Sequence, residues 1–216
     1  VPNFKGGASV PLAANETAMK KANPLYSNIY TQLTQYFGEQ PMTSGPVYVG
    51  AFVLFLFILG CFIVKGPMKW ALLGATLFSI LLSWGKNFMP LTDFFIDFVP
   101  MYNKFRAVSS ILVIAEFTIP LLAILALKRI FDEPSVLKQT RNGLIVSTIL
   151  TFGVALILWI WPSFMGSGFI PTQEMQMLQN ALSPNDLAPL VSNMSEMRAA
   201  MVSTDALRSM VIIAIG

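Results

Sequence analysis

Residues 47–64 read VYVGAFVLFLFILGCFIV, a stretch without a charged side chain. An α-helix rises about 1.5 Å per residue and the hydrocarbon core of a bilayer is roughly 30 Å thick, so about 20 apolar residues cross it. An apolar run of this kind can also be the buried helix of a soluble protein. The interpretation depends on whether the pattern recurs along the chain.

The pattern does recur. Further charge-poor runs follow at 70–84, 107–127, 143–161 and 206–216, of which only 107–127 contains an acid, Glu116. Several such runs in one chain are typical of membrane proteins. We therefore predict an all-α fold, a polytopic transmembrane helical bundle in which these runs and the first one are the membrane helices. The last run is then the start of a fifth helix.

The composition agrees with a membrane location. Hydrophobic residues make up 55% of the 216 residues and charged ones 12%, whereas a soluble domain carries about 25% charged residues. The chain has no histidine and a single cysteine, Cys61, which excludes Ser-His-Asp and Cys-His catalysis and the common zinc sites. The net charge of +3 is not gathered in a basic patch interleaved with aromatic residues, so we expect no nucleic-acid partner.

The basic residues predict an orientation. Short cytoplasmic loops of membrane proteins are enriched in Lys and Arg. The turn 65–69 and the loop 128–141 are rich in basic residues, and they fall on the same side if the spans alternate. We therefore expect both to be cytoplasmic, and residues 1–46, 85–106 and 162–205 to be extracytoplasmic.

The N-terminal residues 1–46 are polar and rich in proline. A short helix is expected from Pro24 to about Tyr36, with Asn23 as its N-cap. The chain begins without methionine and shows no signal peptide, and it stops within an apolar run. We therefore expect it to be an internal piece of a longer protein.

The extracytoplasmic loop 163–205 is expected to be ordered. One helix is predicted to begin at Thr172, and a second at Ser183-Pro184, where an N-cap is followed by proline at the first helical position. The methionines of these helices give them a soft apolar face. We expect this face to pack on the membrane surface or on another domain. The methionines are Met175, Met177, Met194, Met197 and Met201.

Two of the predicted spans carry stripes of small or polar side chains on one face. Residues three and four apart share a helix face, and small residues let two membrane helices approach closely. We expect both stripes to serve helix packing. The stripes are Thr76, Ser79 and Ser83 in the second span, and Gly143, Ser147, Thr151 and Ala155 in the fourth.

Residues 88–106 are too polar to span a membrane, yet they are rich in aromatic side chains. Asp93 and Asp97 are four residues apart and share one helix face, while the neighbouring phenylalanines lie on other faces. This pattern predicts an amphipathic helix in the membrane interface. The two carboxylates either form a solvated face, or hold a divalent metal or act as a base.

Lys104 and Arg106 stand at the start of the run 107–127. Basic side chains at a helix end reach headgroup phosphates in many membrane proteins, which is one interpretation of the pair. These two lie on the less basic, outer side, against the orientation rule. A guanidinium also binds phosphate through two parallel hydrogen bonds. The second interpretation is therefore a site for a phosphate-bearing lipid.

Glu116 lies about ten residues into the third predicted span, near the middle of the membrane. A charge there costs roughly 2.5–3.5 kcal/mol, so we expect the side chain to face the interior of the bundle. It either hydrogen-bonds a neighbouring helix or contacts an ion or a substrate. Ser109 and Pro120 share its face, and Pro120 frees a backbone carbonyl one turn earlier.

Several motifs resemble those of the YfhO-type bacterial multi-pass membrane proteins, in the version found in Bacteroidetes. The resemblance extends, in order, over essentially the whole chain. Its motifs mark the family and do not encode a reaction by themselves. They are PNFKGG at 2–7, SGPVYVG at 44–50, SWGKN at 83–87, YNKFR at 102–106 and DALRS at 205–209.

This family is similar to the GT-C class of membrane glycosyltransferases. The resemblance implies a protein of the bacterial cytoplasmic (inner) membrane that takes a sugar from a polyprenyl-phosphate donor and passes it to a cell-envelope acceptor. The catalytic acid of that class lies in the first extracytoplasmic loop, which is not in this chain, so no catalytic base is named. What carries over is an outer segment with Lys104 and Arg106 at the level of the lipid phosphate. A transporter or lipid flippase centred on Glu116, and a structural subunit without chemistry, are the alternatives.

Overall fold

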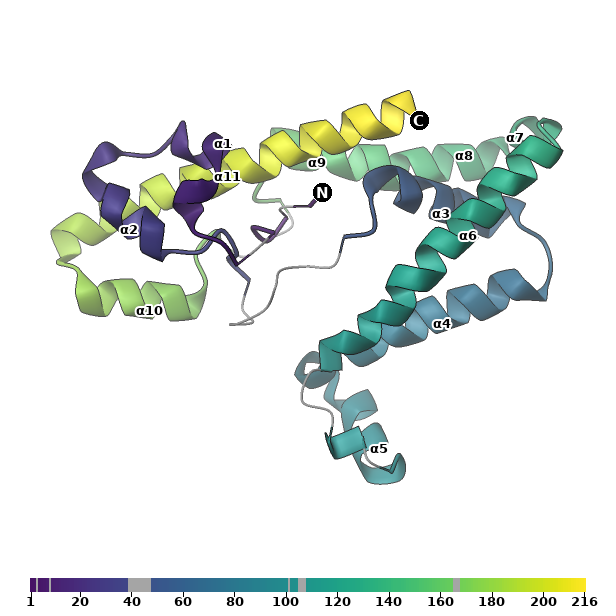
Figure 1. The fold of residues 1–216 in the computed structure, drawn as a ribbon, viewed down its shortest axis with the longest axis horizontal. Helices are drawn as coiled ribbons and strands as arrows, with labels where there is room; N and C mark the ends of the chain where they lie inside the picture. Colours follow the sequence, from purple (N-terminus) through teal and green to yellow (C-terminus); the bar gives the residue numbers. More distant parts are fainter. Residues whose placement is uncertain (3, 8, 39–47, 101, 105–107, 165–167) are drawn as a thin grey trace. The chain divides into compact units, whose positions relative to one another are not determined.

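The chain is described by a computed structural model that covers residues 1–2, 4–7, 9–38, 48–100, 102–104, 108–164 and 168–216. In these residues all regular secondary structure is helical, and extended pairing is confined to a bridge between Pro11 and Thr34. The predicted all-helical fold is thereby confirmed (Figure 1).

The α-helices are α1 (Glu16–Met19), α2 (Ser27–Gln32), α3 (Ala51–Ile63), α4 (Pro67–Ser83), α5 (Met89–Phe98), α6 (Val113–Asp132), α7 (Ser135–Gln139), α8 (Arg141–Thr148), α9 (Val154–Ile160), α10 (Thr172–Ala181) and α11 (Pro184–Ile215). Shorter 3₁₀ turns cover Leu12–Ala14, Pro24–Tyr26, Gly85–Phe88, Tyr102–Lys104 and Val108–Leu112, and a π-helical turn covers Ile149–Gly153.

Two continuous helical stretches of the described chain are long and apolar enough to cross a membrane. They are Ser109–Asp132, with 24 residues, and Arg141–Ile160, with 20 residues. Both coincide closely with predicted spans. The other two predicted spans form the apolar helices α3 and α4, which have 13 and 17 residues and are shorter than the roughly 20 residues that a bilayer requires.

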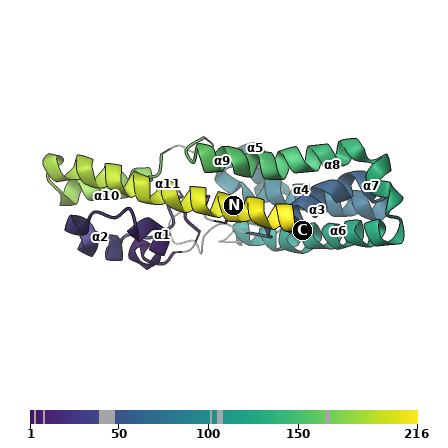
Figure 2. The same cartoon turned by 90° about the horizontal axis from the view of Figure 1, so that it is seen from above.

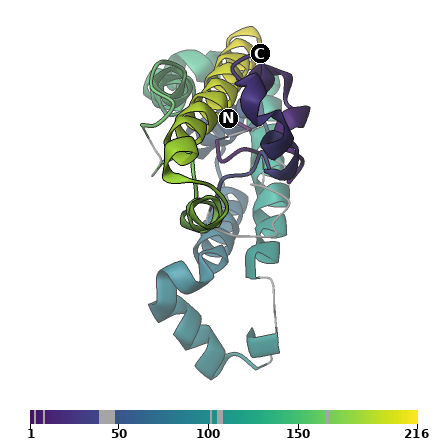
Figure 3. The same ribbon diagram turned by 90° about the vertical axis from the view of Figure 1, so that its left-hand side faces the viewer.

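The chain folds as two compact units, which are described here one at a time. The first comprises Val1–Ala51 and Thr151–Gly216. In it α11 packs along α9 and along α1 (Figures 2 and 3). Its main core joins the N-terminal segment to α10 and α11, and its buried members are Leu12, Ala18, Tyr30, Leu178, Leu190, Met194, Met197 and Met201.

The second unit comprises Phe52–Leu150, and α4 and α6 run side by side in it (Figure 1). Thr76 on α4 and Thr118 on α6 join their hydroxyl oxygens by a buried hydrogen bond of 2.7 Å. Ser79, one turn after Thr76, is fully buried. The polar stripe of the second predicted span therefore serves helix packing, as expected.

Small residues bring α3 close to both of its neighbours in the second unit. A Cβ atom added at Gly60 would lie 3.1 Å from the carbonyl oxygen of Leu122 on α6, and one added at Gly143 on α8 would lie 2.8 Å from Phe62 on α3. The remaining members of the stripe that starts at Gly143 are also buried. The packing role predicted for this stripe is confirmed.

The loop 163–205 and the apolar run that follows it share one helix. α11 begins at Pro184 and continues unbroken to Ile215, so the predicted run 206–216 is the last part of this helix. One part of the predicted methionine face requires correction: Met194, Met197 and Met201 on α11 are buried against the chain's own N-terminal helices. Met177 on α10 is 71% exposed, so for it the expectation stays a prediction. The starts at Thr172 and Pro184 are as predicted.

The N-terminal helix is shorter than expected. Asn23 caps it as predicted, since its side-chain oxygen accepts a 3.1 Å hydrogen bond from the Leu25 backbone N–H. The helix ends at Gln32 rather than near Tyr36. Residues 33–35 instead cross to the segment near Pro11, where the Leu12 N–H donates to the Leu33 carbonyl at 2.7 Å.

Candidate functional site

A helix, α5, is present within the segment 88–106 for which an amphipathic helix is predicted (Figure 1). Pro90 occupies the first turn, where its missing N–H costs nothing, and the Thr92 hydroxyl donates to the Gly85 carbonyl at 2.8 Å. No residue of this helix is buried. Its apolar side chains therefore remain at least partly exposed in the described chain.

Aromatic rings hold α5 against the end of α4 and the following turn. The Phe95 ring lies 5.7 Å from Phe78 on α4 and 5.3 Å from Tyr102, centre to centre. The rings of Phe94 and Phe98, one turn apart on α5, lie tilted to each other with centres 5.1 Å apart, and Phe98 is 71% exposed. These two exposed rings form the apolar face of α5.

Asp93 and Asp97 occupy a different side of α5 from the exposed rings, and both are exposed. In the described part of the chain no three His, Cys, Asp or Glu residues come together in a way that could hold a metal ion. Two solvated carboxylates without a third ligand do not fit a resident metal site, which needs several ligands in a fixed geometry. The arrangement matches the solvated face.

Lys104 ends the turn Tyr102–Lys104, and its side chain is exposed. The hydroxyl of Tyr102 is buried and has no hydrogen-bond partner among the described residues. Arg106, the second member of the predicted phosphate site, lies outside the described residues. The structure therefore places one of the two predicted cations, at the end of the segment that carries α5.

Glu116 does not face the packed interior of the second unit. The buried face of α6 is formed by Ala115, Thr118, Leu122 and neighbouring residues, whereas Glu116 is exposed. At 100° per residue, Glu116 lies roughly a quarter turn from the centre of that face. The register between α6 and α4 decides this placement, and the sequence of α6 alone does not specify it.

The most deeply buried charge of the described chain is one that the sequence analysis did not single out. The side chain of Arg198 on α11 is 0% exposed. Its two terminal nitrogens donate to the two carboxylate oxygens of Glu174 on α10, at 2.6 and 2.8 Å. This parallel pairing is the strong, geometrically specific form of an arginine–carboxylate contact.

Arg198 also binds the backbone of two further segments. It donates to the Phe169 carbonyl at 2.7 Å and to the Thr34 carbonyl at 3.0 Å, and its guanidinium lies 5.4 Å from the centre of the Phe37 ring. One side chain thus joins the N-terminal segment, the start of α10 and α11. The signal in the sequence was a cation placed one turn from both Met194 and Met201, on an apolar helix face.

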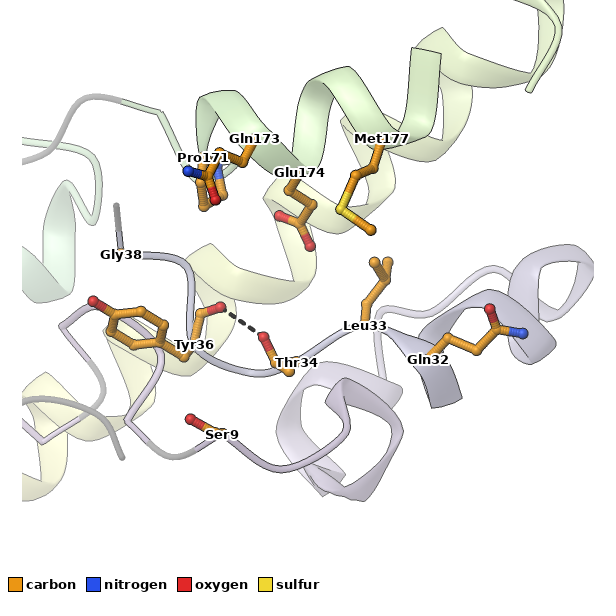
Figure 4. Close-up of a pocket in the computed structure, with 10 residues that line it drawn as sticks. All are labelled: Ser9, Gln32, Leu33, Thr34, Tyr36, Gly38, Pro171, Gln173, Glu174 and Met177. Carbon is orange, nitrogen blue, oxygen red and sulfur yellow. Dashed lines mark hydrogen bonds between the residues drawn. The ribbon is translucent and has the colours of Figure 1, made fainter. Parts of the chain in front are cut away.

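The Arg198–Glu174 pair lies beside a cavity of about 370 Å³ in the first unit (Figure 4). Glu174 contributes its carboxylate to the wall, and the Thr34 hydroxyl donates to the Tyr36 carbonyl there at 2.9 Å. Because both carboxylate oxygens accept from Arg198, Glu174 is an ion-paired wall residue rather than an available base. The cavity is lined by Ser9, Gln32, Leu33, Thr34, Tyr36, Gly38, Pro171, Gln173, Glu174 and Met177.

The comparisons with known proteins add no relative. No protein-family model, no curated protein and no solved structure matches the chain. The resemblance to the YfhO-type proteins therefore rests on the motifs alone, and the function that it implies is a proposal.

Proposed function

We propose that the chain is part of a multi-pass protein of the bacterial cytoplasmic membrane. The two longest apolar helices support this location, because only 33% and 28% of their most apolar windows are buried within the chain. The core helix of a soluble protein would be mostly buried. Large apolar side chains such as Phe117, Ile124 and Phe131 point away from the packed face and are exposed, which suits contact with lipid.

The proposed orientation has independent support from the first unit. Residues 1–46 and 163–205 are assigned to the extracytoplasmic side, and segments of both pack together in one core. Asn193 on α11 joins them directly: its side-chain oxygen accepts from the Tyr30 hydroxyl at 2.6 Å, and its amide donates to the Lys21 carbonyl at 2.8 Å. Two segments that fold together must lie on the same side of a membrane.

Within this frame we propose a glycosyltransferase that uses a polyprenyl-phosphate sugar to modify a cell-envelope acceptor. The observation that carries the proposal is α5, an amphipathic helix with exposed Phe94 and Phe98, followed within a few residues by the exposed Lys104. A ring-bearing face places such a helix at the level of lipid headgroups. A cation there binds the phosphate of a lipid-linked donor.

In this proposal Lys104 and Arg106 hold the donor phosphate, and the solvated face with Asp93 and Asp97 points to the aqueous side. No step is assigned to a metal, since the described residues do not form a metal site. The transporter or flippase alternative requires Glu116 at the centre of a helix bundle. Because Glu116 is exposed on α6, we place the transporter or flippase second. A purely structural subunit is the third candidate.

The test is transfer of sugar from a polyprenyl-phosphate donor by the full-length protein in membranes. We expect Lys104→Ala and Arg106→Ala each to abolish transfer at normal expression, while Lys138→Ala, which removes an exposed cation on α7, leaves it unchanged. Normal transfer by both variants would remove the phosphate-binding role. A larger effect of Glu116→Gln than of either cation variant would favour the transporter.

A further inference from the structure

A basic pocket lies at the other end of the second unit from α5, where α3 and α6 end. It has a volume of about 250 Å³ and is lined by Val64, Lys65, Leu125, Lys128, Arg129 and Asp132. Most of the charged side chains around it are cations. The pocket is distinct from the proposed donor site, because it belongs to the loops that the orientation places in the cytoplasm.

The packing of α3 on α6 explains why these residues meet. Gly60 on α3 lies against Leu122 and Ala126 on α6. Val64, one turn after Gly60, lines the pocket together with Leu125 and Arg129, which follow one turn later on α6. The helices are therefore parallel, and their carboxyl ends lie together. The negative end of each helix dipole favours cations at this place.

The charges of the pocket are only partly neutralised. Arg129 pairs with Glu133 at 2.5 Å through one terminal nitrogen, while its Nε is buried and has no partner among the described residues. Lys65 and Lys128 form no ion pair with any described residue. An anion in the pocket would meet the two ammonium groups of Lys65 and Lys128 beside the Arg129 guanidinium.

The surroundings of the pocket have the character of a membrane interface. Lys69 lies in the first turn of α4, four residues after Lys65, and its ammonium group is 4.8 Å from the centre of the exposed Trp70 ring. Tryptophan and lysine together mark the headgroup level of a membrane protein. Below the cations, Leu125 continues the wall toward the apolar part of α6. The pocket thus offers a polar end and an apolar side to one ligand.

We infer that this pocket binds the phosphate of an anionic phospholipid from the cytoplasmic leaflet. The inference rests on the proposed membrane location but not on glycosyl transfer. Asp132 in the wall favours a phosphodiester with one negative charge over free phosphate, which carries nearly two at neutral pH. Basic pockets between membrane helices on the cytoplasmic side are suited to such headgroups.

The experiment measures binding of fluorescent phosphatidylglycerol to the detergent-purified full-length protein by anisotropy. We expect the double variant Lys65→Ala/Lys128→Ala to bind about thirtyfold more weakly than the wild type, from the usual contribution of each basic residue to anionic-lipid binding. Asp132→Asn should bind more tightly. Lys138→Ala is the matched control and should bind as the wild type does, with melting temperatures confirming that all variants are folded.

Competition experiments with unlabelled compounds identify the ligand. Unlabelled phosphatidylglycerol should displace the probe, and phosphatidylcholine and inorganic phosphate should not. Equal binding by the double variant and the wild type, or equal competition by phosphatidylcholine, would overturn the inference. Displacement by inorganic phosphate at millimolar concentration would show a free-phosphate site and would overturn the lipid assignment. Loss of lipid binding in a variant that still transfers sugar separates this inference from the proposed function.

Discussion

Arg198 shows how a buried charge is accommodated in the first unit. Removing a cation from water is costly, and good hydrogen bonds to the charge recover much of the cost. The two terminal nitrogens of the guanidinium make four hydrogen bonds, two to Glu174 and two to backbone carbonyls of Thr34 and Phe169, while Nε is buried and has no partner among the described residues. The side chain therefore fixes the geometry of three chain segments at once.

Removal of Arg198 should strongly destabilise the protein. We expect Arg198→Ala to lower the free energy of unfolding by about 3–5 kcal/mol, because Glu174 and two carbonyls lose their partner in a buried place. The control is Arg208→Ala: Arg208 pairs with Asp205 at 3.3 Å but is 71% exposed, so the expected loss is below about 1 kcal/mol. Chemical denaturation in detergent measures both. Equal effects of the two variants would show that the buried pair has no special role.

Tyr30 gives the first unit a dependence on alkaline pH. Burial raises the pKa of the Tyr30 phenol above its ordinary value of 10.0, and its hydroxyl donates to Asn193. The folded state thus favours the neutral phenol. This contribution is complete below pH 10 and is lost as the pH rises past 10 toward the higher pKa of the folded protein, because the unfolded chain ionises first.

The melting temperature of the wild type should therefore fall as the pH rises above about 10, and that of Tyr30→Phe should fall less over the same range. Tyr36→Phe, which leaves the Tyr30–Asn193 contact intact, should follow the wild type. Identical pH profiles for the wild type and Tyr30→Phe would mean that this phenol does not couple to folding.

At the scale of elements, the contact of α8 with α3 depends on a missing side chain. A Cβ atom at Gly143 would lie 2.8 Å from Phe62 and from the Thr140 side chain, whereas one at Gly74 on α4 would meet nothing within 4 Å. Gly143→Ala should therefore destabilise the protein by about 1–3 kcal/mol through overpacking. Gly74→Ala should be neutral or stabilise it by up to about 1 kcal/mol, because alanine favours the helix.

Thermal unfolding of the two alanine variants in the same detergent is the measurement. Alanine should lower the melting temperature at Gly143 and leave it unchanged or raise it at Gly74, although both glycines lie in helices. If Gly143→Ala melts at or above the melting temperature of Gly74→Ala, the close contact described between α8 and α3 is contradicted.

The elements that the sequence predicts well are those set by local periodicity. The stripes that contain Thr76 and Gly143 are spaced at three and four residues, so their packing role is visible in the sequence. The pairing of Arg198 with Glu174 spans a loop and draws in Thr34 from the far end of the chain, so no local pattern reveals it. The exposure of Glu116 depends on which side of α6 meets α4, which is a property of the pair of helices.

The methionines of α11 are a second case in which the sequence does not reveal the packing partner, because that partner is far away along the chain. An apolar face at helical spacing predicts that something covers it but does not name the partner. The structure supplies the N-terminal helices, through Leu12, Ala18 and Tyr30. For the candidate site, the sequence predicted α5 and its two faces, while the cavity beside Glu174 arises only from the tertiary fold.

At the scale of the whole molecule, the account depends on the membrane topology. The helices Ser109–Asp132 and Arg141–Ile160 are joined by the turn that contains α7. If both cross the membrane, α7 lies on one side, and α10 and the N-terminal helices lie on the other. The proposed outer position of Lys104 and the proposed inner position of the basic pocket both depend on this topology.

Cysteine labelling of bacterial spheroplasts tests this topology most directly. In a Cys61→Ser background, cysteine is introduced at Ser135 on α7 or at Gln179 on α10, both of which are exposed. A membrane-impermeant maleimide should label Gln179→Cys in intact spheroplasts and Ser135→Cys only after permeabilisation. Labelling of both sites before permeabilisation, or the reverse pattern, would contradict the proposed membrane topology.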